Sequence, residues 1–327
     1  MKLVVDTARV TAPATIENLG PTLNALALAL NMTDTVKAKA ITGPSVVRQV
    51  SRGASVRPAI LRLVGDDAAD HPTVRALHYV LDEVGSPQFG VELAYEAGIP
   101  RHVGLGSREA QVVIGFLLAR AMLGEPDTLN WRVLARFASH FKLSPPRVAA
   151  SLFGGLVLVL PEPGADEFGP LLTPPLRFTT APQVEPTVFV PDFTITQSAD
   201  QMMPQAVQFR RNVRNASRAA ALIPTLTGVN MDVLGEDVWR DYLMSATADD
   251  IYQVHREPLS PASIQLVTWL RSYGLPAVLS GNGPAVVSLL PAPEEITDAA
   301  RRSGWAIYNP GVLSTSVLSG SSAPTKW

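Results

Sequence analysis

The chain has 327 residues, of which 46% are hydrophobic and 17% charged, so it is long enough for two domains and apolar enough to bury sizeable cores. A formal net charge of −2 offers no electrostatic attraction to nucleic acid, and no nucleic-acid partner is expected. Cysteine is absent, which excludes disulfides, thiolate metal sites and cysteine nucleophiles. No apolar run reaches the roughly 18–20 residues of a membrane span, and residues 1–10 make a poor signal peptide, so we expect a cytoplasmic protein with no membrane partner.

The first half of the chain mixes strand-like and helix-like patterns. Short alternating or continuous apolar runs predict strands over residues 2–11, 33–41, 88–95 and 153–161. Apolar residues at helical spacing predict helices over residues 74–84, 109–123 and 131–141. Pro13 and Pro21 hold the backbone between them in an irregular course. The leucines after Pro21 predict one more helix, packed against a sheet: Leu23, Leu26, Leu28 and Leu30.

The second half has the same mixture. Prolines concentrate over residues 161–182, and this stretch is predicted to cross between two domains, 1–165 and 166–327. Beyond it, we expect a strand over 187–193, a hairpin over 275–291, and helices over 205–224, 230–246, 261–273 and 293–302. The last eight residues are expected to form a frayed tail. Strands and helices in both halves predict two α+β domains.

A glycine-rich segment, PRHVGLGSREA at 100–110, stands between a predicted strand and a predicted helix, where a phosphate-binding loop belongs. Gly104 and Gly106 allow backbone N–H groups to approach an anion closely. Ser107 can cap the following helix, whose N-terminus attracts negative charge. A simple tight turn would also account for the two glycines.

Three segments resemble the motifs of the GHMP small-molecule kinases, and most of all those of homoserine kinase. TAPATIENLGPTLNALALAL at 11–30 is similar to PATxANLGPGFDxLGLAL. The loop from Pro100 is similar to PxxxGLGSSAA, and LSGNGPAVVSLLP at 279–291 is similar to SGxGPTVFAL. Three further segments resemble homoserine kinase: VPDFTITQSADQMMP at 190–204, RNASRAAALIPTL at 214–226 and DDIYQVHREPLSP at 249–261.

The resemblance implies an α+β, two-domain GHMP kinase fold with the site between the domains. A ribosomal protein S5 domain 2-like N-terminal domain, 1–165, would carry the phosphate loop. A ferredoxin-like C-terminal domain would span 166–327. Members of the resembling family are commonly dimers, so a homodimer is expected.

The resemblance also implies roles for individual residues. Asn18, Asn24 and Ser107 would be catalytic, with the two asparagines orienting an acceptor hydroxyl and Ser107 holding Mg²⁺. Glu109 departs from the motif, but it could supply a replacement Mg²⁺ ligand and so be catalytic as well; the other interpretation is a solvated glutamate favoured by the helix dipole. ATP would be bound through Pro100, His102, Val103, Gly104, Leu105, Gly106, Ser107 and Arg108. The small-molecule substrate would be bound through Thr15, Thr196, Arg256, Asn282 and Gly283.

The chain departs from these motifs at positions that do chemistry. Arg108 and Glu109 replace small residues after the loop, and the family's H-P-D-N falls on Ser144-Pro145-Pro146-Arg147. No Asp or Glu occurs between Asp127 and Glu162, where the family has its metal-binding glutamate. Asn24 replaces an aspartate, and Asp200 stands where an arginine for the homoserine carboxylate is expected. Arg108 could neutralise phosphate in place of a metal. Arg136, Lys142 and Arg147 could add to such a basic pocket, although scattered basic residues on a helix usually lie on a solvated face.

Two functions are therefore open. One is ATP-dependent phosphorylation of a small hydroxylated metabolite, homoserine or a related amino alcohol, in amino-acid biosynthesis. The other is a catalytically degenerate GHMP-fold protein that binds a ligand or a partner without the metal site. A minor alternative follows from PRHVGLGS, which also resembles the loop of β-ribofuranosylaminobenzene phosphate synthases, GHMP-fold enzymes that use phosphoribosyl diphosphate.

Overall fold

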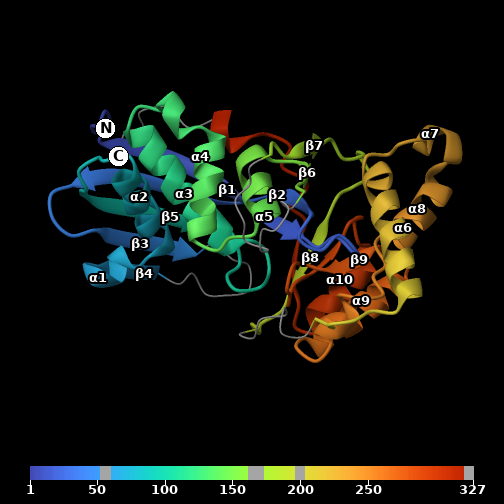
Figure 1. Ribbon diagram of the computed structural model, residues 1–327. Coiled ribbons are helices and arrows are strands. Elements are labelled where there is room, and N and C mark those ends of the chain that lie inside the picture. Colours follow the sequence, from blue (N-terminus) through green and yellow to red (C-terminus); the bar gives the residue numbers. More distant parts are fainter. Residues whose placement is uncertain (52–59, 161–172, 196–202, 320–327) are drawn as a thin grey trace.

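The computed structural model describes residues 1–51, 60–160, 173–195 and 203–319. Figure 1 shows an elongated molecule with the blue and green first half of the chain on the left and most of the yellow to red second half on the right. The described strands form a seven-stranded sheet, built mostly from the first half of the chain, and a four-stranded sheet from the second half. Strands and helices are mixed in both halves, as predicted.

The first sheet is organised around a long antiparallel pair, β1 (Thr7–Glu17) and β2 (Leu26–Ile41). The predicted helix after Pro21 is wrong, because Leu26, Leu28 and Leu30 lie in β2 and are fully buried. Leucines two residues apart share one face of a strand, and here they enter the main core. Ala27 and Ala29 face the other way and belong to a separate, alanine-rich cluster, which explains why this run lacks polar residues.

The remaining strands of this sheet are β3 (Val46–Ser51), β4 (Ile60–Val64), β5 (Gly90–Ala97), β6 (Leu156–Leu158) and β7 (Leu176–Phe178). Their order is β4-β3-β5-β2-β6-β7, with β1 paired to β2. β5 and β6 confirm the strands predicted over 88–95 and 153–161. The sequence patterns did not predict β3 and β4.

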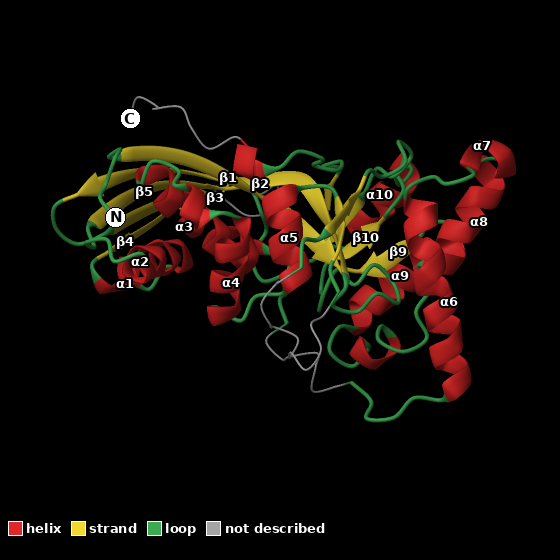
Figure 2. Ribbon diagram, turned by 45° about the horizontal axis from the view of Figure 1, so that its top comes forward, coloured by secondary structure: helices red, strands yellow, loops and turns green. Residues whose placement is uncertain are grey.

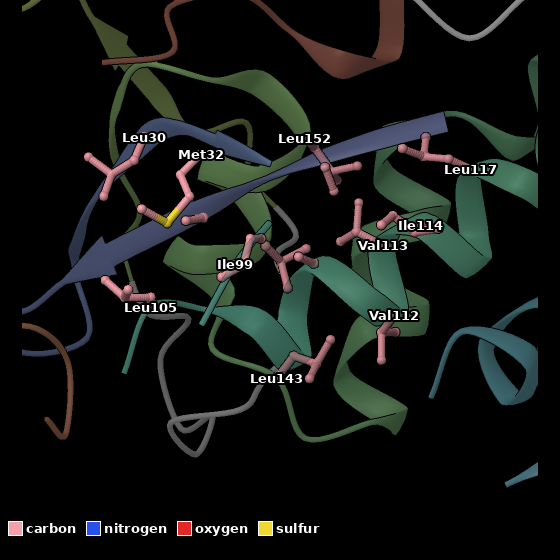
Figure 3. Packing of buried hydrophobic residues seen from close by; sticks show 14 of the residues in the cluster. Leu30, Met32, Ile99, Leu105, Val112, Val113, Ile114, Leu117, Leu143 and Leu152 are labelled. Atoms are coloured by element: carbon pink, nitrogen blue, oxygen red, sulfur yellow. The ribbon is translucent and has the colours of Figure 1, made fainter. Parts of the chain in front are cut away.

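Helices cover one face of the first sheet in Figure 2: α2 (Pro72–Glu83), α3 (Ser107–Met122), α4 (Trp131–His140) and α5 (Pro145–Phe153), with the short α1 (Asp66–Ala69) at its edge. The first three confirm predicted helices. α5 was not predicted, since its two opening prolines resemble a turn. Figure 3 shows Val113 and Ile114 of α3 close to Leu152 of α5, and all three side chains are fully buried. This packing holds the loop before α3 against the core.

The second sheet is antiparallel, in the order β11-β8-β10-β9. Its strands are β8 (Thr187–Val190), β9 (Ala277–Leu279), β10 (Val286–Ser288) and β11 (Ala306–Tyr308). The helices of this half are α6 (Phe209–Leu226), α7 (Met231–Leu234), α8 (Glu236–Ala246), α9 (Pro261–Ser272) and α10 (Glu294–Arg302). They confirm the four predicted helices, except that residues 230–246 are divided between α7 and α8.

The chain returns to the first sheet near its C-terminal end, where Leu313 N donates to Ala29 O at 3.0 Å. The domain division at 165 and the expected tail at 320–327 lie outside the described residues, so both stay predictions. The helices of the described ranges include none that is long and apolar enough to span a membrane.

Candidate phosphate-binding site

The loop between β5 and α3 has the backbone geometry of an anion-binding turn. Gly104 and Gly106 have φ of 86° and 68°, and His102, a non-glycine residue, has φ of 57°. α3 begins directly after Gly106 and runs for 16 residues from Ser107. The first N–H groups of such a helix have no carbonyl partner within it, so together with the helix dipole they attract an anion.

β1 fixes one side of the loop. Thr15 N donates to Leu105 O at 3.0 Å, and a Cβ at Gly106 would collide with Thr15 Oγ1. Thr15 is fully buried, which makes it part of the support under the loop. Leu105 is 1% exposed and anchors the loop in the core, where Figure 3 labels it.

The hairpin between β9 and β10 fixes the other side. Ser280 Oγ donates to Gly104 O at 2.8 Å, and Ala285 N donates to Val103 O at 3.0 Å. A Cβ at Gly104 would come within 2.8 Å of Gly283 O, so glycine is needed for this approach. The predicted phosphate loop and the predicted hairpin motif, which are far apart in sequence, are therefore in contact.

A buried ion-pair cluster supports the loop from below. Arg147 of α5 is 6% exposed, and its Nε lies 2.8 Å from Glu17 Oε1 at the end of β1. Its Nη2 donates to Gly104 O at 3.0 Å, and its Nη1 lies 3.8 Å from Glu109 Oε2. Ser144 Oγ donates to the second oxygen of Glu17. Of the two placements left open for Arg147, the structure excludes the solvated face, and these partners compensate the burial of its charge.

The charges of the cluster reinforce one another. Burial by itself would lower the pKa of Arg147, but the neighbouring Glu17 and then Glu109 carboxylates raise it, so the guanidinium stays protonated. The cluster holds one cation and two carboxylates. Both carboxylates therefore already have a cationic partner within the chain.

The fit of this site to Mg²⁺ is poor. Magnesium in kinase sites is held by one or two carboxylates together with substrate phosphates. Glu109, the predicted ligand, faces Arg147, and Glu17 is bonded to both Arg147 and Ser144. Within the described residues, no group of three or more His, Asp or Glu side chains could hold a metal ion. The donor set as arranged does not provide a protein-held magnesium site.

The predicted acceptor-orienting residues lie in the turn between β1 and β2. Asn18 Oδ1 accepts a hydrogen bond from Asn24 N at 3.0 Å, and both asparagines have left-handed φ, 58° and 52°. Asn18 is 5% exposed. The turn is tied to the hairpin, since Gly281 N donates to Glu17 O at 3.0 Å. Both asparagines are thus held close to the phosphate loop.

Arg256, the predicted substrate-binding arginine, lies in the 3₁₀ helix Val254–Arg256 and is 2% exposed. Its Nη1 donates to Gly281 O at 2.9 Å, so the same hairpin turn that contacts the loop also holds this guanidinium. Asn282 and Gly283 complete that turn. Thr196 and Asp200 lie outside the described residues.

The other loop residues point in different directions. Arg108 Nη2 donates to Phe141 O at 2.9 Å, which directs this exposed side chain to the end of α4. His102 is exposed, whereas Val103 is buried in the core. The Arg147 guanidinium therefore contacts the loop from inside the site, whereas Arg108 lies at the edge of the site.

Sequence reasoning missed Glu17 and Ser144 and left Arg147 open between a basic pocket and a solvated face. A signal was present, because Glu17 stands where the first motif has alanine and Arg147 stands at the last letter of H-P-D-N. Two opposite charges at two departures from a motif pattern indicate a pair. The distance in sequence, 127 positions between Ser144 and Glu17, hid the contact.

A second buried network fixes the start of the loop. Asp34 is fully buried and accepts hydrogen bonds from Tyr95 Oη at 2.8 Å and from the N–H groups of Gly98 and Ile99 at 2.9 and 3.0 Å. Arg101 Nη1 lies 2.6 Å from the same carboxylate. Burial, and next the Asp34 charge, raise the pKa of Tyr95, so the phenol stays a donor.

Comparison with known proteins supplies the family. The homoserine kinase of Streptomyces avermitilis is 33% identical over 303 residues, covering 91% of this chain and 90% of that protein. The homoserine kinase of Streptomyces coelicolor is 33% identical over 307 residues, covering 93% and 91%. No protein-family model matches the chain.

Solved structures support the same assignment at the level of the fold. The homoserine kinase of Cytophaga hutchinsonii has a TM-score of 0.72 at 20% identity, with 95% of this chain and 96% of that chain covered. The mevalonate kinase of L. major, in complex with R-mevalonate, has a TM-score of 0.63 at 16% identity, covering 96% and 98%. These likenesses confirm the predicted GHMP fold, and with the sequence relatives they establish that the chain belongs to the homoserine kinase family of the GHMP kinases.

Proposed function

We propose that this protein phosphorylates homoserine or a closely related amino alcohol, with ATP as the phosphoryl donor. The observation that carries the proposal is the contact between the glycine loop at the start of α3 and the hairpin turn at 280–283. Its relatives named homoserine kinase, at 33% identity over most of the chain, supply the reaction class.

The residues take the following roles in this proposal. Backbone N–H groups of the loop and of the first turn of α3 bind the ATP phosphates, with the Ser107 hydroxyl beside them. Asn18 and Asn24 orient the acceptor hydroxyl, and Arg256 fixes an anionic group of the substrate. The acceptor oxygen bonds to the γ-phosphorus as the bond to the ADP oxygen breaks, and the hydroxyl proton passes to solvent water. Mg²⁺ neutralises phosphate charge in such reactions.

A second function is favoured by the Arg147 cluster. Because Glu17 and Glu109 face a guanidinium, the protein could bind nucleotide phosphates without transferring them. This is the degenerate, ligand-binding alternative. The phosphoribosyl diphosphate alternative shares the same loop and differs only in the ligand.

Calorimetric titration with ATP, in the presence of magnesium and of EDTA, separates these functions. Binding followed by ADP release on addition of L-homoserine supports the kinase. Equal binding in both buffers with no ADP release from any amino alcohol supports the ligand-binding alternative. Binding of phosphoribosyl diphosphate but not of ATP would overturn both. Sedimentation of the same sample tests the expected homodimer.

A further inference from the structure

Arg147 is the one side chain in the described cluster that contacts the loop and both carboxylates. Its three nitrogens are directed to three different segments. Nε faces Glu17 at the end of β1, Nη2 bonds to Gly104 O in the loop, and Nη1 faces Glu109 in the first turn of α3. A planar guanidinium with fixed donor directions can hold three segments at once, which a point charge cannot do.

The hairpin closes around the same group. A Cβ at Gly281 would collide with Arg147 Nη2, so the turn lies directly against the guanidinium. Gly104 O also accepts a hydrogen bond from Ser280 Oγ, at 2.8 Å. Two donors from different segments, Arg147 of α5 and Ser280 of the hairpin, therefore fix the orientation of a single loop carbonyl.

The orientation of the Gly104 carbonyl determines the direction in which the loop N–H groups point. A peptide plane that directs its C=O towards Arg147 directs its N–H, which belongs to Leu105, away from it. The left-handed φ of Gly104 and Gly106 then sets the direction of the next two N–H groups. We propose that Arg147 is a positioning residue for nucleotide binding: it holds Gly104 O so that the loop N–H groups are directed at the phosphates. This rests on the proposed function only in that a nucleotide is the ligand.

Two substitutions separate positioning from simple structural support. Arg147→Lys keeps a cation for Glu17 but lacks the second nitrogen that bonds to Gly104 O. Arg147→Gln removes the charge as well. Arg136→Gln is the matched control, because Arg136 is exposed on α4, where its guanidinium lies over the ring of Phe137.

The first measurement needs no ligand. Hydrogen exchange followed by mass spectrometry should show faster exchange in peptides covering 100–110 in both Arg147 variants, with peptides from α2 and α9 unchanged. Arg136→Gln should match the parent protein. Loop exchange at the parent rate in both Arg147 variants overturns the proposal, and so does a uniform rise across the whole chain, which marks a merely structural role.

The second measurement is ATP binding. Arg147→Lys loses the charge-assisted hydrogen bond to Gly104 O, which should weaken ATP binding by roughly tenfold or more. The melting temperature of this variant should stay near that of the parent protein. In turnover, the KM for ATP should rise while the KM for the acceptor stays within about twofold. If Arg147→Lys has both the melting temperature and the ATP affinity of the parent protein, the positioning role is rejected. If the parent protein binds no ATP, the proposed function fails and with it the nucleotide-binding role of Arg147, whereas the exchange data still decide whether Arg147 orders the loop.

Discussion

His71 shows how one buried residue makes stability depend on pH. Its Nδ1 accepts from Thr73 N at 3.2 Å and so caps α2, and its ring is 6% exposed. Burial, and then the positive charge of Arg101, lower its pKa to about 4. Between about pH 6.5 and pH 4 the unfolded chain therefore binds a proton that the folded chain excludes, and stability falls as the pH falls.

We expect the free energy of unfolding to drop by about 2 kcal/mol from this residue between pH 8 and pH 5. His71→Asn keeps a capping side chain without a titrating ring. Urea unfolding of both proteins at the two pH values should show a smaller drop in the variant. Equal drops would mean that His71 does not account for the pH dependence.

Gly106 gives a second prediction for a single residue. Gly106→Ala places a Cβ against Thr15 Oγ1 at a left-handed φ, whereas Gly85→Ala has a similar φ, 61°, and no atom within 4 Å of the new Cβ. Backbone strain alone costs about 1–2 kcal/mol and applies to both variants. Gly106→Ala should therefore be the less stable variant in urea, and only it should lose ATP binding. Equal stability of the two variants would show that β1 moves to accommodate the new Cβ without loss of stability.

At the level of elements, the contact between α2 and α3 depends on a glycine. A Cβ at Gly115 would lie 2.6 Å from Ala76 Cβ and would also meet Thr73 O. Alanine gains about 1 kcal/mol in helix propensity over glycine, but overpacking a core costs about 1–3 kcal/mol. Gly115→Ala should lower the melting temperature, with far-UV circular dichroism unchanged at 25 °C. A higher melting temperature would mean that α2 moves freely.

Helices and strands whose hydrophobic residues follow one clear periodicity were predictable from the sequence. Elements with an ambiguous or weak periodicity were not. α3 and α9 have sustained apolar spacing and begin and end within two residues of their predicted bounds. The leucine–alanine run in β2 fits both helical and strand periodicity. Its hydrogen-bonded pairing with β1 makes it a strand. β3, with Arg48 and Gln49 inside a short strand, and α5, which opens on prolines, carry weak local signals.

The candidate site was predictable where backbone geometry is encoded locally. The loop glycines and the hairpin turn were found from the motifs they resemble, because left-handed φ requires particular residues. The Glu17–Arg147 pair was not found, since a charged pair has no local pattern and depends on how α5 packs on β1. The structural role of the pair follows from the burial of both side chains, and burial depends on the packing of the whole molecule.

At the scale of the whole molecule, the two sheets share one core. The largest cluster of buried hydrophobic residues contains side chains of β1 and β2 together with Val188 of β8, Val287 of β10 and Leu289. A core that is continuous across both sheets couples their unfolding, because neither sheet can expose its face without the other losing contacts. The chain should therefore unfold in one transition although it has two sheets.

Leu289→Ala tests this coupling. Leu289 is fully buried, and its truncation should cost about 2–5 kcal/mol. Because the core is shared, hydrogen exchange at increasing urea should show peptides from β2 and from β10 losing protection at the same, lower concentration in the variant. Ala300→Gly, within the separate smaller cluster under α10, provides the comparison. If Leu289→Ala lowered protection in β10 and left β2 at the parent midpoint, the sheets would be independent folding units, and the loop–hairpin contact would be an interface between two domains that open separately.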